Sequence, residues 1–445
     1  MTTDLLSIAR SATRAARTQL DVTAQNIANA GTDGYVRRTV STEEVMTPGY
    51  VAGNRDVSLS GVRVTGVIRN ADAFRQAEVR RTDADTARAD IEVGGLTDIQ
   101  SALEAPGVYS AITGFETALT QLAQSPTDTP LRASVIAAAQ TMANSFNIAS
   151  NQLDAVAKGQ QGGASDGVNQ INTMSAELAK VNARLARMAD ASSDRTGLLD
   201  QRDMLLEKLA GYADIATSFA SNGAVDVTLG GASGAPLVTG ATAQALAVTT
   251  AADGTIGFTV NGGALTLSGG SLAGQQQVLA SLADVHGQLD TLAKSVIDTV
   301  NTAQGNGAAL DGSTGPALFS GTGAGSMQLA TTNGSAIATA AAGAAANSRD
   351  TSNLTALRNA LTSADPAGTM DTLIYQASAT VQARTTTRDA LKTISDAAKT
   401  ALSAQAGVDL DTEAINLTRF QQAFQASGRV MQVAGNLFDT ILSIK

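Results

Sequence analysis

Five charged residues lie close together near the middle of the chain and could suggest acid–base catalysis. They are Asp194, Arg195, Asp200, Arg202 and Asp203. Carboxylates held beside guanidinium groups can donate and accept protons at a reacting centre. Surface ion pairs around a capped helix start account for the same residues without any reaction. We prefer this second interpretation.

Two further features resemble chemical sites only in part. Residues 321–325 read GTGAG, as in a phosphate-binding loop, but no Lys-Ser or Lys-Thr follows and no clear strand precedes them. We expect a flexible loop there. His286 is the one histidine and lies beside an apolar stripe at 282, 285 and 289, so we expect a helix-flank residue. Because the chain has no Cys, thiolate catalysis and thiolate metal sites are excluded, and we predict no enzyme activity, cofactor or metal.

The composition favours long, closely packed helices. The 445 residues suffice for about two or three domains with real cores. Aromatic residues make up 3 % of the chain and Trp is absent, an unusual composition for a shaped catalytic pocket. The formal charge is −10 and the acidic residues are spread out, which argues against a nucleic-acid-binding surface.

We expect no targeting or membrane-spanning segment. Residues 1–20 alternate apolar residues with Arg10, Arg14 and Arg17, and therefore lack the apolar core and the cleavage site of a signal peptide. The arginine row would also suit a helix on a membrane surface, but we prefer a solvated face of an assembly helix. No window reaches the roughly 18 apolar residues of a membrane span. If the chain leaves the cell, we expect it to do so without a cleaved signal peptide.

The last stretch, residues 409–445, predicts a helix that buries one narrow seam. Apolar residues recur every seven positions, and a second row falls three positions after the later ones. Together the two rows form an a/d stripe over about four heptads, which is typical of a helix that packs on another helix. The residues that we expect at this seam are Leu410, Leu417, Phe420, Phe424, Met431, Phe438 and Ile441.

The first stretch predicts the partner helix. Its seam carries Leu5, Ile8, Ala12, Ala15 and Val22, and Leu20 and Ile27 widen it. Asn29 and Gly31 lie where the helix should stop, with Gly31 free to become left-handed, and Gly34 then turns the chain into Tyr35. The acidic residues at the start of the C-terminal helix suit the helix dipole.

The interior predicts a long helical bundle with a small β insertion. Helical periods cover about 71–105, 110–124, 130–158, 171–188, 198–212, 274–296 and 370–405. Residues 215–268 instead alternate in short runs, with Asn-Gly turns at 222–223 and 261–262. We therefore expect a mainly α fold in three parts. These are a coiled-coil assembly domain of paired terminal helices (1–45 with 405–445), an elongated bundle (46–212 with 275–404) and an inserted β domain (213–274).

Both ends of the chain resemble a known family. Residues 27–35 (IANAGTDGY) with Arg37 resemble the N-terminal motif that bacterial flagellar rod, hook and hook-associated proteins share. Residues 413–426 (EAINLTRFQQAFQA), continuing to 437–439, resemble the C-terminal motif of the same proteins. In the interior, residues 198–203 (LLDQRD), the stretch from Asn301 to Phe319 and the pair at 353–354 are similar to the hook-associated protein 1 branch, the first hook–filament junction proteins. The β insertion is small, and an outer domain of longer members is missing or reduced.

The resemblance implies a structural protein of the bacterial flagellum, extracellular at the hook–filament junction and without catalysis. It implies export through the flagellar type III apparatus and assembly through the terminal helices into a ring of copies. The implied partners are hook protein, hook-associated protein 3 and a cytoplasmic export chaperone at the C-terminal helix. The residues implied at the assembly interface are the two seams together with Asn29, Gly34 and Tyr35.

Two alternatives stay open at this point. A flagellar rod or hook subunit would share the terminal motifs, although the LLDQRD stretch argues against it. A secreted binding or adhesin protein would use the β insertion. Asn26, Asn29 and Asn416 are polar residues that could fix the register of a helix seam, or could equally be solvent-facing amides or helix caps.

Overall fold

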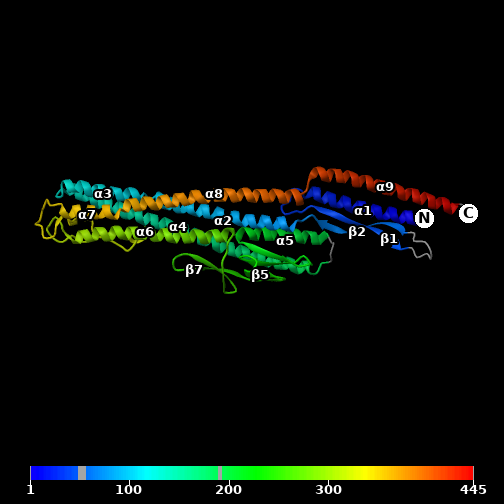
Figure 1. The fold of residues 1–445 in the computed structure, drawn as a ribbon, viewed down its shortest axis with the longest axis horizontal. Coiled ribbons are helices and arrows are strands. Elements are labelled where there is room, and N and C mark those ends of the chain that lie inside the picture. Colours follow the sequence, from blue (N-terminus) through cyan, green and yellow to red (C-terminus); the bar gives the residue numbers. More distant parts are fainter. Residues whose placement is uncertain (1, 49–56, 189–192, 444–445) are drawn as a thin grey trace.

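Long helices run along one axis of the molecule and give it the shape of a rod (Figure 1). The computed structural model describes residues 2–48, 57–188 and 193–443. The helices are α1 (Thr2–Ala28), α2 (Ala73–Glu104), α3 (Val108–Gln124), α4 (Thr129–Leu185), α5 (Ser193–Tyr212), α6 (Gly270–Gly305), α7 (Ser352–Ala364), α8 (Pro366–Ala406) and α9 (Leu410–Ser443).

The strands form small antiparallel sheets beside these helices. They are β1 (Arg38–Pro48), β2 (Val57–Arg69), β3 (Ile215–Phe219), β4 (Val225–Leu229), β5 (Ala235–Thr239), β6 (Thr242–Ala243), β7 (Leu246–Thr250), β8 (Ile256–Val260), β9 (Gly263–Leu265), β10 (Gly307–Ala308), β11 (Phe319–Ser320), β12 (Gln328–Leu329) and β13 (Ala340–Ala341). The expected fold class, mainly α with a small β insertion, is confirmed.

One end of the rod consists of α1, α9 and the hairpin β1–β2. Helices α1 and α9 lie side by side and run in opposite directions, and the hairpin packs along α1 (Figure 1). The expected boundary at residue 45 falls inside β1, whose partner strand β2 also packs on α1. The division of the chain into three domains stays a proposal. The prediction that Gly31 adopts a left-handed conformation is wrong, because the residue with positive φ after α1 is Gly34, at 73°.

The bundle of α2, α3, α4, α6, α7 and α8 forms the long part of the rod. A core of Leu, Val, Ile, Ala and Phe side chains runs between these helices. Helix α4 is continuous where the sequence predicted two separate helices. Its glycines leave room for α6, because a Cβ on Gly163 would lie 2.6 Å from Gln275 Nε2 and one on Gly167 would lie 2.9 Å from Leu272 Cδ2. These glycines therefore mark a close helix approach and no break.

Polar groups supplement the packing of α8 along α2. Asp83 accepts a hydrogen bond from Ser395 (2.6 Å) and lies 2.8 Å from Lys399 Nζ. Between residues 374 and 394, α8 buries no side chain fully. The fully buried side chains of α8 thus lie toward its two ends, and between them Arg384 and Arg388 reach Glu92 (3.7 Å) and Asp90 (3.9 Å) of α2.

The β insertion covers one side of α4, α5 and α6. It contains a four-stranded sheet, β3-β4-β5-β6, and a three-stranded sheet, β7-β8-β9, over a second apolar core. The two expected Asn-Gly turns are confirmed between β3 and β4 and between β8 and β9, with positive φ at Gly223, Asn261 and Gly262. Such turns match the twist of paired strands.

A buried arginine organises the far end of the rod. Arg132 of α4 is 1 % exposed and donates to the carbonyl oxygens of Pro126 (2.6 Å), Gly334 (3.1 Å) and Ile337 (2.8 Å). Burial lowers the pKa of this guanidinium. Carbonyl oxygens therefore replace water around a cation that has no carboxylate partner within 4 Å among the described residues.

Within the described part of the chain, none of the helices is both long enough and apolar enough to cross a membrane.

Candidate functional site

The expected seam of α9 faces α1 along part of its length. Leu417, Phe420 and Met431 are half-buried, and Ala434 in the second row is 4 % exposed. Phe424 and Phe438 keep 39 % and 48 % of their surface exposed. Leu410 also stays exposed, and the side chain of Ile441 lies outside the described residues. The helix pair of one chain thus leaves part of its own apolar seam open.

The expected seam of α1 is divided between two neighbours. Ala12 and Ile27 are half-buried, and Leu5 is exposed. Ile8 lies beneath the hairpin, since a Cβ on Gly61 would come within 3.2 Å of its Cα. Val22 is buried and borders a cavity that Thr39 and Phe420 also line. The stripe on α1 therefore serves both α9 and the hairpin, because a helix between two elements needs a wide apolar face.

Helix α9 also carries a second apolar row outside the seam. Ile415, Val433 and Leu437 are 69 %, 58 % and 46 % exposed, and Val430 is exposed beside them. Val430, Val433 and Leu437 follow one another at helical spacing, and exposed apolar side chains that cluster in this way are typical of a surface that another protein covers.

Asn26 joins the end of α1 to the chain that follows it. The side chain is 1 % exposed and makes every hydrogen bond that an amide can make. Its Nδ2 donates to Arg38 O (2.9 Å) and Glu413 Oε2 (3.2 Å), and its Oδ1 accepts from Arg38 N (3.0 Å) and Tyr35 Oη (2.8 Å). Burial raises the pKa of the Tyr35 phenol, against the opposing effect of Arg38. The role of Asn26 is thus that of a connector between segments.

Glu413 completes this group from the other end of the sequence. It is 1 % exposed and accepts from Arg37 Nε at 2.7 Å as well as from Asn26. The sequence suggested only an acidic residue suited to a helix dipole. Glu413 does lie in the first turn of α9, but it also occupies the seam row seven positions before Phe420, where its side chain is buried. We call Asn26, Tyr35, Arg37 and Glu413 the motif cluster, because all four belong to or adjoin the two terminal motifs.

The other expected residues of the N-terminal motif lie around this cluster. Asn29 is half-buried, and its Nδ2 donates to Gln25 O of the last turn of α1 (2.9 Å). Gly34 supplies the left-handed turn before Tyr35, a conformation that side chains other than glycine rarely adopt.

A second group of charges ties the terminal end of the rod to α5. Arg38 Nη2 donates to Asp200 Oδ2 at 2.7 Å, and Arg69 lies 2.7 Å from Asp200 and 2.8 Å from Asp203. Arg202 donates twice to Asp203 Oδ1, at 2.8 and 2.6 Å. We call these five residues the joint ion cluster.

The joint ion cluster corrects one expectation from the sequence. Arg202 and Asp203 are each 8 % exposed, so the expected surface ion pairs are largely buried here. Partners from β1 and β2, which the sequence could not place beside LLDQRD, cover them.

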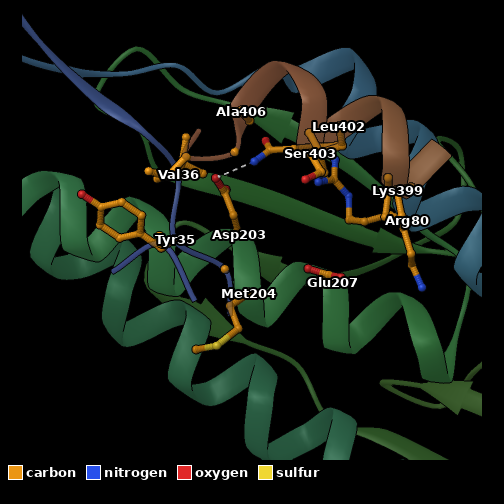
Figure 2. A pocket seen from close by; sticks show the side chains of 16 residues that line it. Tyr35, Val36, Arg80, Asp203, Met204, Glu207, Lys399, Leu402, Ser403 and Ala406 are labelled. Atoms are coloured by element: carbon orange, nitrogen blue, oxygen red, sulfur yellow. Dashed lines mark hydrogen bonds between the residues drawn. The ribbon is translucent and has the colours of Figure 1, made fainter. Parts of the chain in front are cut away.

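A cavity of about 300 Å³ lies between the terminal end of the rod and the bundle. Its walls come from the loop after α1, from α2 and α5, and from the link between α8 and α9 (Figure 2). We call it the joint cavity. Its apolar wall includes Val36, Met204 and Leu402, and its charged groups are Arg80, Asp203, Glu207 and Lys399.

The other chemical-looking features are held in structural contacts. His286 lies 3.2 Å from Ser150 Oγ, 3.5 Å from Asp154 and 3.4 Å from Asp290. Ser150 is only 3 % exposed, beneath the glycine loop at 321–325, so this serine is closed to a substrate. That loop is fixed by a 2.7 Å hydrogen bond from Ala324 N to Asp290 Oδ1. Nowhere in the described ranges do three or more His, Asp or Glu residues gather in a way that could hold a metal ion.

Three family models match different parts of the chain. The flagellar hook-associated protein FlgK helical domain matches residues 94–319. The flagella basal body rod protein matches residues 6–35, and the flagellar basal body rod FlgEFG protein C-terminal region matches residues 401–444. The two terminal matches coincide with the segments that meet in the motif cluster.

Individual relatives agree with these matches. The flagellar hook-associated protein 1 of Bacillus subtilis is 28 % identical over 225 residues, covering 49 % of this chain and 44 % of that protein. Its namesake from Salmonella typhimurium is 28 % identical over 250 residues, covering 55 % and 44 %. The chain therefore aligns with less than half the length of these relatives. The solved flagellar hook junction protein FlgK from Burkholderia pseudomallei shares the fold, with a TM-score of 0.54 and 21 % identity over 60 % of this chain and 66 % of that one.

Proposed function

Because the chain belongs to the family of flagellar hook-associated protein FlgK, we propose that it is a structural subunit joining the hook to the filament of the bacterial flagellum. One observation carries this proposal. The two terminal motifs, separated by more than 370 residues, meet in one buried cluster at the base of a helix pair that keeps apolar side chains exposed. A helix pair of this kind has apolar surface available for neighbouring subunits.

The proposed assembly uses the helix pair as its interface. A neighbouring copy that covers Phe424, Phe438 and the second apolar row of α9 would remove this surface from water, at about 25 cal/mol per Å² of apolar area. Isolated long helices are marginal in water, so contact with neighbours would also strengthen their order. We propose that the terminal domain, residues 1–45 with 405–445, makes this contact, together with Asn29, Gly34 and Tyr35. The bundle, residues 46–212 with 275–404, and the β domain, 213–274, would lie outside it.

The proposed partners follow from the junction role. They are further copies of this chain in a ring, hook protein on one side and hook-associated protein 3 on the other. Before assembly, a cytoplasmic chaperone would cover the C-terminal helix, and the chain would be exported through the flagellar type III apparatus to its extracellular place. The role is structural, with no reaction catalysed.

Deletion of the gene tests the role directly. The expected result is cells with bare hooks and filament protein shed into the medium, because filament subunits would have no surface on which to assemble. Loss of the hooks themselves would move the protein to the rod or hook. Intact filaments would overturn the flagellar role altogether.

Complementation with point variants tests the interface. Phe424→Asp or Phe438→Asp should abolish incorporation while the purified chain keeps its helical content. Both side chains are partly exposed within one copy, so a carboxylate at either position would stay in contact with water. The matched control is Tyr375→Asp, because Tyr375 is 71 % exposed and belongs to the first part of α8, which begins at the end of the rod away from the helix pair (Figure 1). Normal filaments with either Phe variant would show that this seam does not drive assembly.

A further inference from the structure

Arg80 is a buried cation without a carboxylate partner. Its side chain is 6 % exposed, yet no Asp or Glu oxygen among the described residues lies within 4 Å of it. Its one hydrogen bond, from Nη2 to Thr217 Oγ1, is long at 3.4 Å. Buried charges in proteins are normally paired, because removing an ion from water is costly. Arg80 therefore retains donor groups that the chain itself does not use.

The unused donors line the joint cavity. Figure 2 shows Arg80 among the side chains around the joint cavity, together with Ser403 and Leu402 of α8, which also line the cavity. A volume of about 300 Å³ accommodates a small organic group, and Val36, Met204 and Leu402 offer it an apolar wall. The cavity thus combines one unpaired cation with an apolar surface.

Two of the three other charged groups around the cavity already have partners. Asp203 is already occupied by Arg69 and Arg202, and Lys399 pairs with Asp83 at 2.8 Å. The charged groups of the lining itself are two cations, Arg80 and Lys399, and two carboxylates, Asp203 and Glu207. Glu207 shares the cavity with Arg80 without reaching it. Burial, with Asp83 adding to the effect, raises the pKa of the Glu207 carboxyl.

We propose that the joint cavity is a carboxylate-binding site, in which Arg80 holds the carboxylate and Met204 and Leu402 contact an apolar stem. A guanidinium can donate two parallel hydrogen bonds to a carboxylate, which gives such a site its selectivity. The carboxylate belongs either to a free carboxylic acid or to an Asp or Glu side chain of a second copy. The site goes beyond the junction role and stands independently of it.

The test uses a matched pair of probes on the full-length chain at low concentration. Isovalerate and isovaleramide have nearly the same shape, but only the first carries a charge. Saturation-transfer NMR should detect isovalerate and give at least about tenfold weaker binding of isovaleramide, because the amide lacks the charge-assisted pair with Arg80. Equal binding of both probes, or no binding of isovalerate, would overturn the proposal.

Variants locate the binding. Arg80→Met should weaken isovalerate about tenfold, whereas Arg184→Met, an exposed arginine on α4, should leave it unchanged. Met204→Trp fills the cavity without changing its charge and should also block isovalerate binding. This second variant tests the site independently of Arg80, in case Arg80→Met fails to fold. Glu207→Gln removes a competing carboxylate and should tighten binding severalfold. Unchanged binding in both the Arg80 and the Met204 variants would refute the site.

A last arm separates the two sources of the carboxylate. If isovalerate suppresses self-association of the unmodified chain, measured by light scattering, the natural occupant is a side chain of a second copy. If self-association is unaffected, the occupant is a free carboxylic acid. Because probe binding is measured on single copies, its failure would leave the junction role untouched, and intact filaments after gene deletion would leave the site untouched.

Discussion

Substitution of Glu413 should loosen the terminal helix pair far more than its surface counterpart does. In Glu413→Ala, Arg37 and Asn26 lose the carboxylate that accepts from them at 2.7 and 3.2 Å. Breaking a buried ion pair from one side costs about 3–5 kcal/mol. The Arg37 side chain is 23 % exposed and can recover some hydration, so we expect the lower end, about 3 kcal/mol.

The chain supplies a matched control in the same region. Glu43 pairs with Arg63 at 2.9 Å on the hairpin, with both side chains more than half exposed. An exposed pair contributes about 0–1 kcal/mol, so Glu43→Ala should have little effect. Glu413→Gln keeps an acceptor for Asn26 or Arg37 and should fall between the two alanine variants.

Hydrogen exchange followed by mass spectrometry measures the difference. Peptides from the end of α1 and the start of α9 should exchange roughly a hundredfold faster in Glu413→Ala, since each 1.4 kcal/mol is about a tenfold change. The Glu43→Ala variant should stay within about fivefold of the unmodified chain, and core peptides of α4 should not change in either variant. Equal acceleration by the two alanine variants would refute the idea that burial makes the Glu413 pair important.

Two further predictions concern helix packing and pH. Gly95→Ala should lower the free energy of unfolding by about 1–3 kcal/mol, because the new Cβ would overlap Val278 of α6. Gly94→Ala has open space around it and should raise the free energy of unfolding by about 0.5–1 kcal/mol. Denaturant titration should therefore give changes of opposite sign for the two variants, and changes of the same sign would contradict the packing argument. Hydrogen bonds from the Thr412 hydroxyl and from two backbone amides lower the pKa of Asp409. At pH values above the ordinary pKa of 3.8, the Asp409 carboxylate therefore stabilises the start of α9, and this stabilisation is lost as the pH falls through the lowered pKa. Carbon-α chemical shifts of the first turn should therefore differ between Asp409→Ala and the unmodified chain at pH 7 and converge in acid, and a difference that persists in acid would contradict this role.

The heptad rows predicted the helices at both ends, but not how their residues divide between neighbours. Leu417, Phe420 and Met431 pack where a 3.5-residue repeat puts them. The repeat also marks Phe424 and Phe438, which stay partly exposed because α1 divides its apolar face between α9 and the hairpin. A periodicity specifies one face of a helix, and the width of the partner decides how much of that face is covered.

Buried polar contacts were the least predictable part of the site. The sequence marks Asn26 as a possible register-fixing residue, whereas its partner Glu413 has the features of an ordinary acidic residue at a helix start. The one available signal was position, since Glu413 stands in the row of Phe420 and Ala434 where an apolar residue is expected. The sequence carries no signal for the burial of Arg132, because two of its three carbonyl acceptors, Gly334 and Ile337, lie more than 200 residues away.

The joint ion cluster has a mechanical consequence. Only two covalent links, residues 70–72 and 407–409, connect the terminal end of the rod to the bundle. The pairs from Arg38 and Arg69 to Asp200 and Asp203 add a third, noncovalent attachment between the two parts. A twist applied to the helix pair would therefore reach the bundle through α5 as well as through the two covalent links.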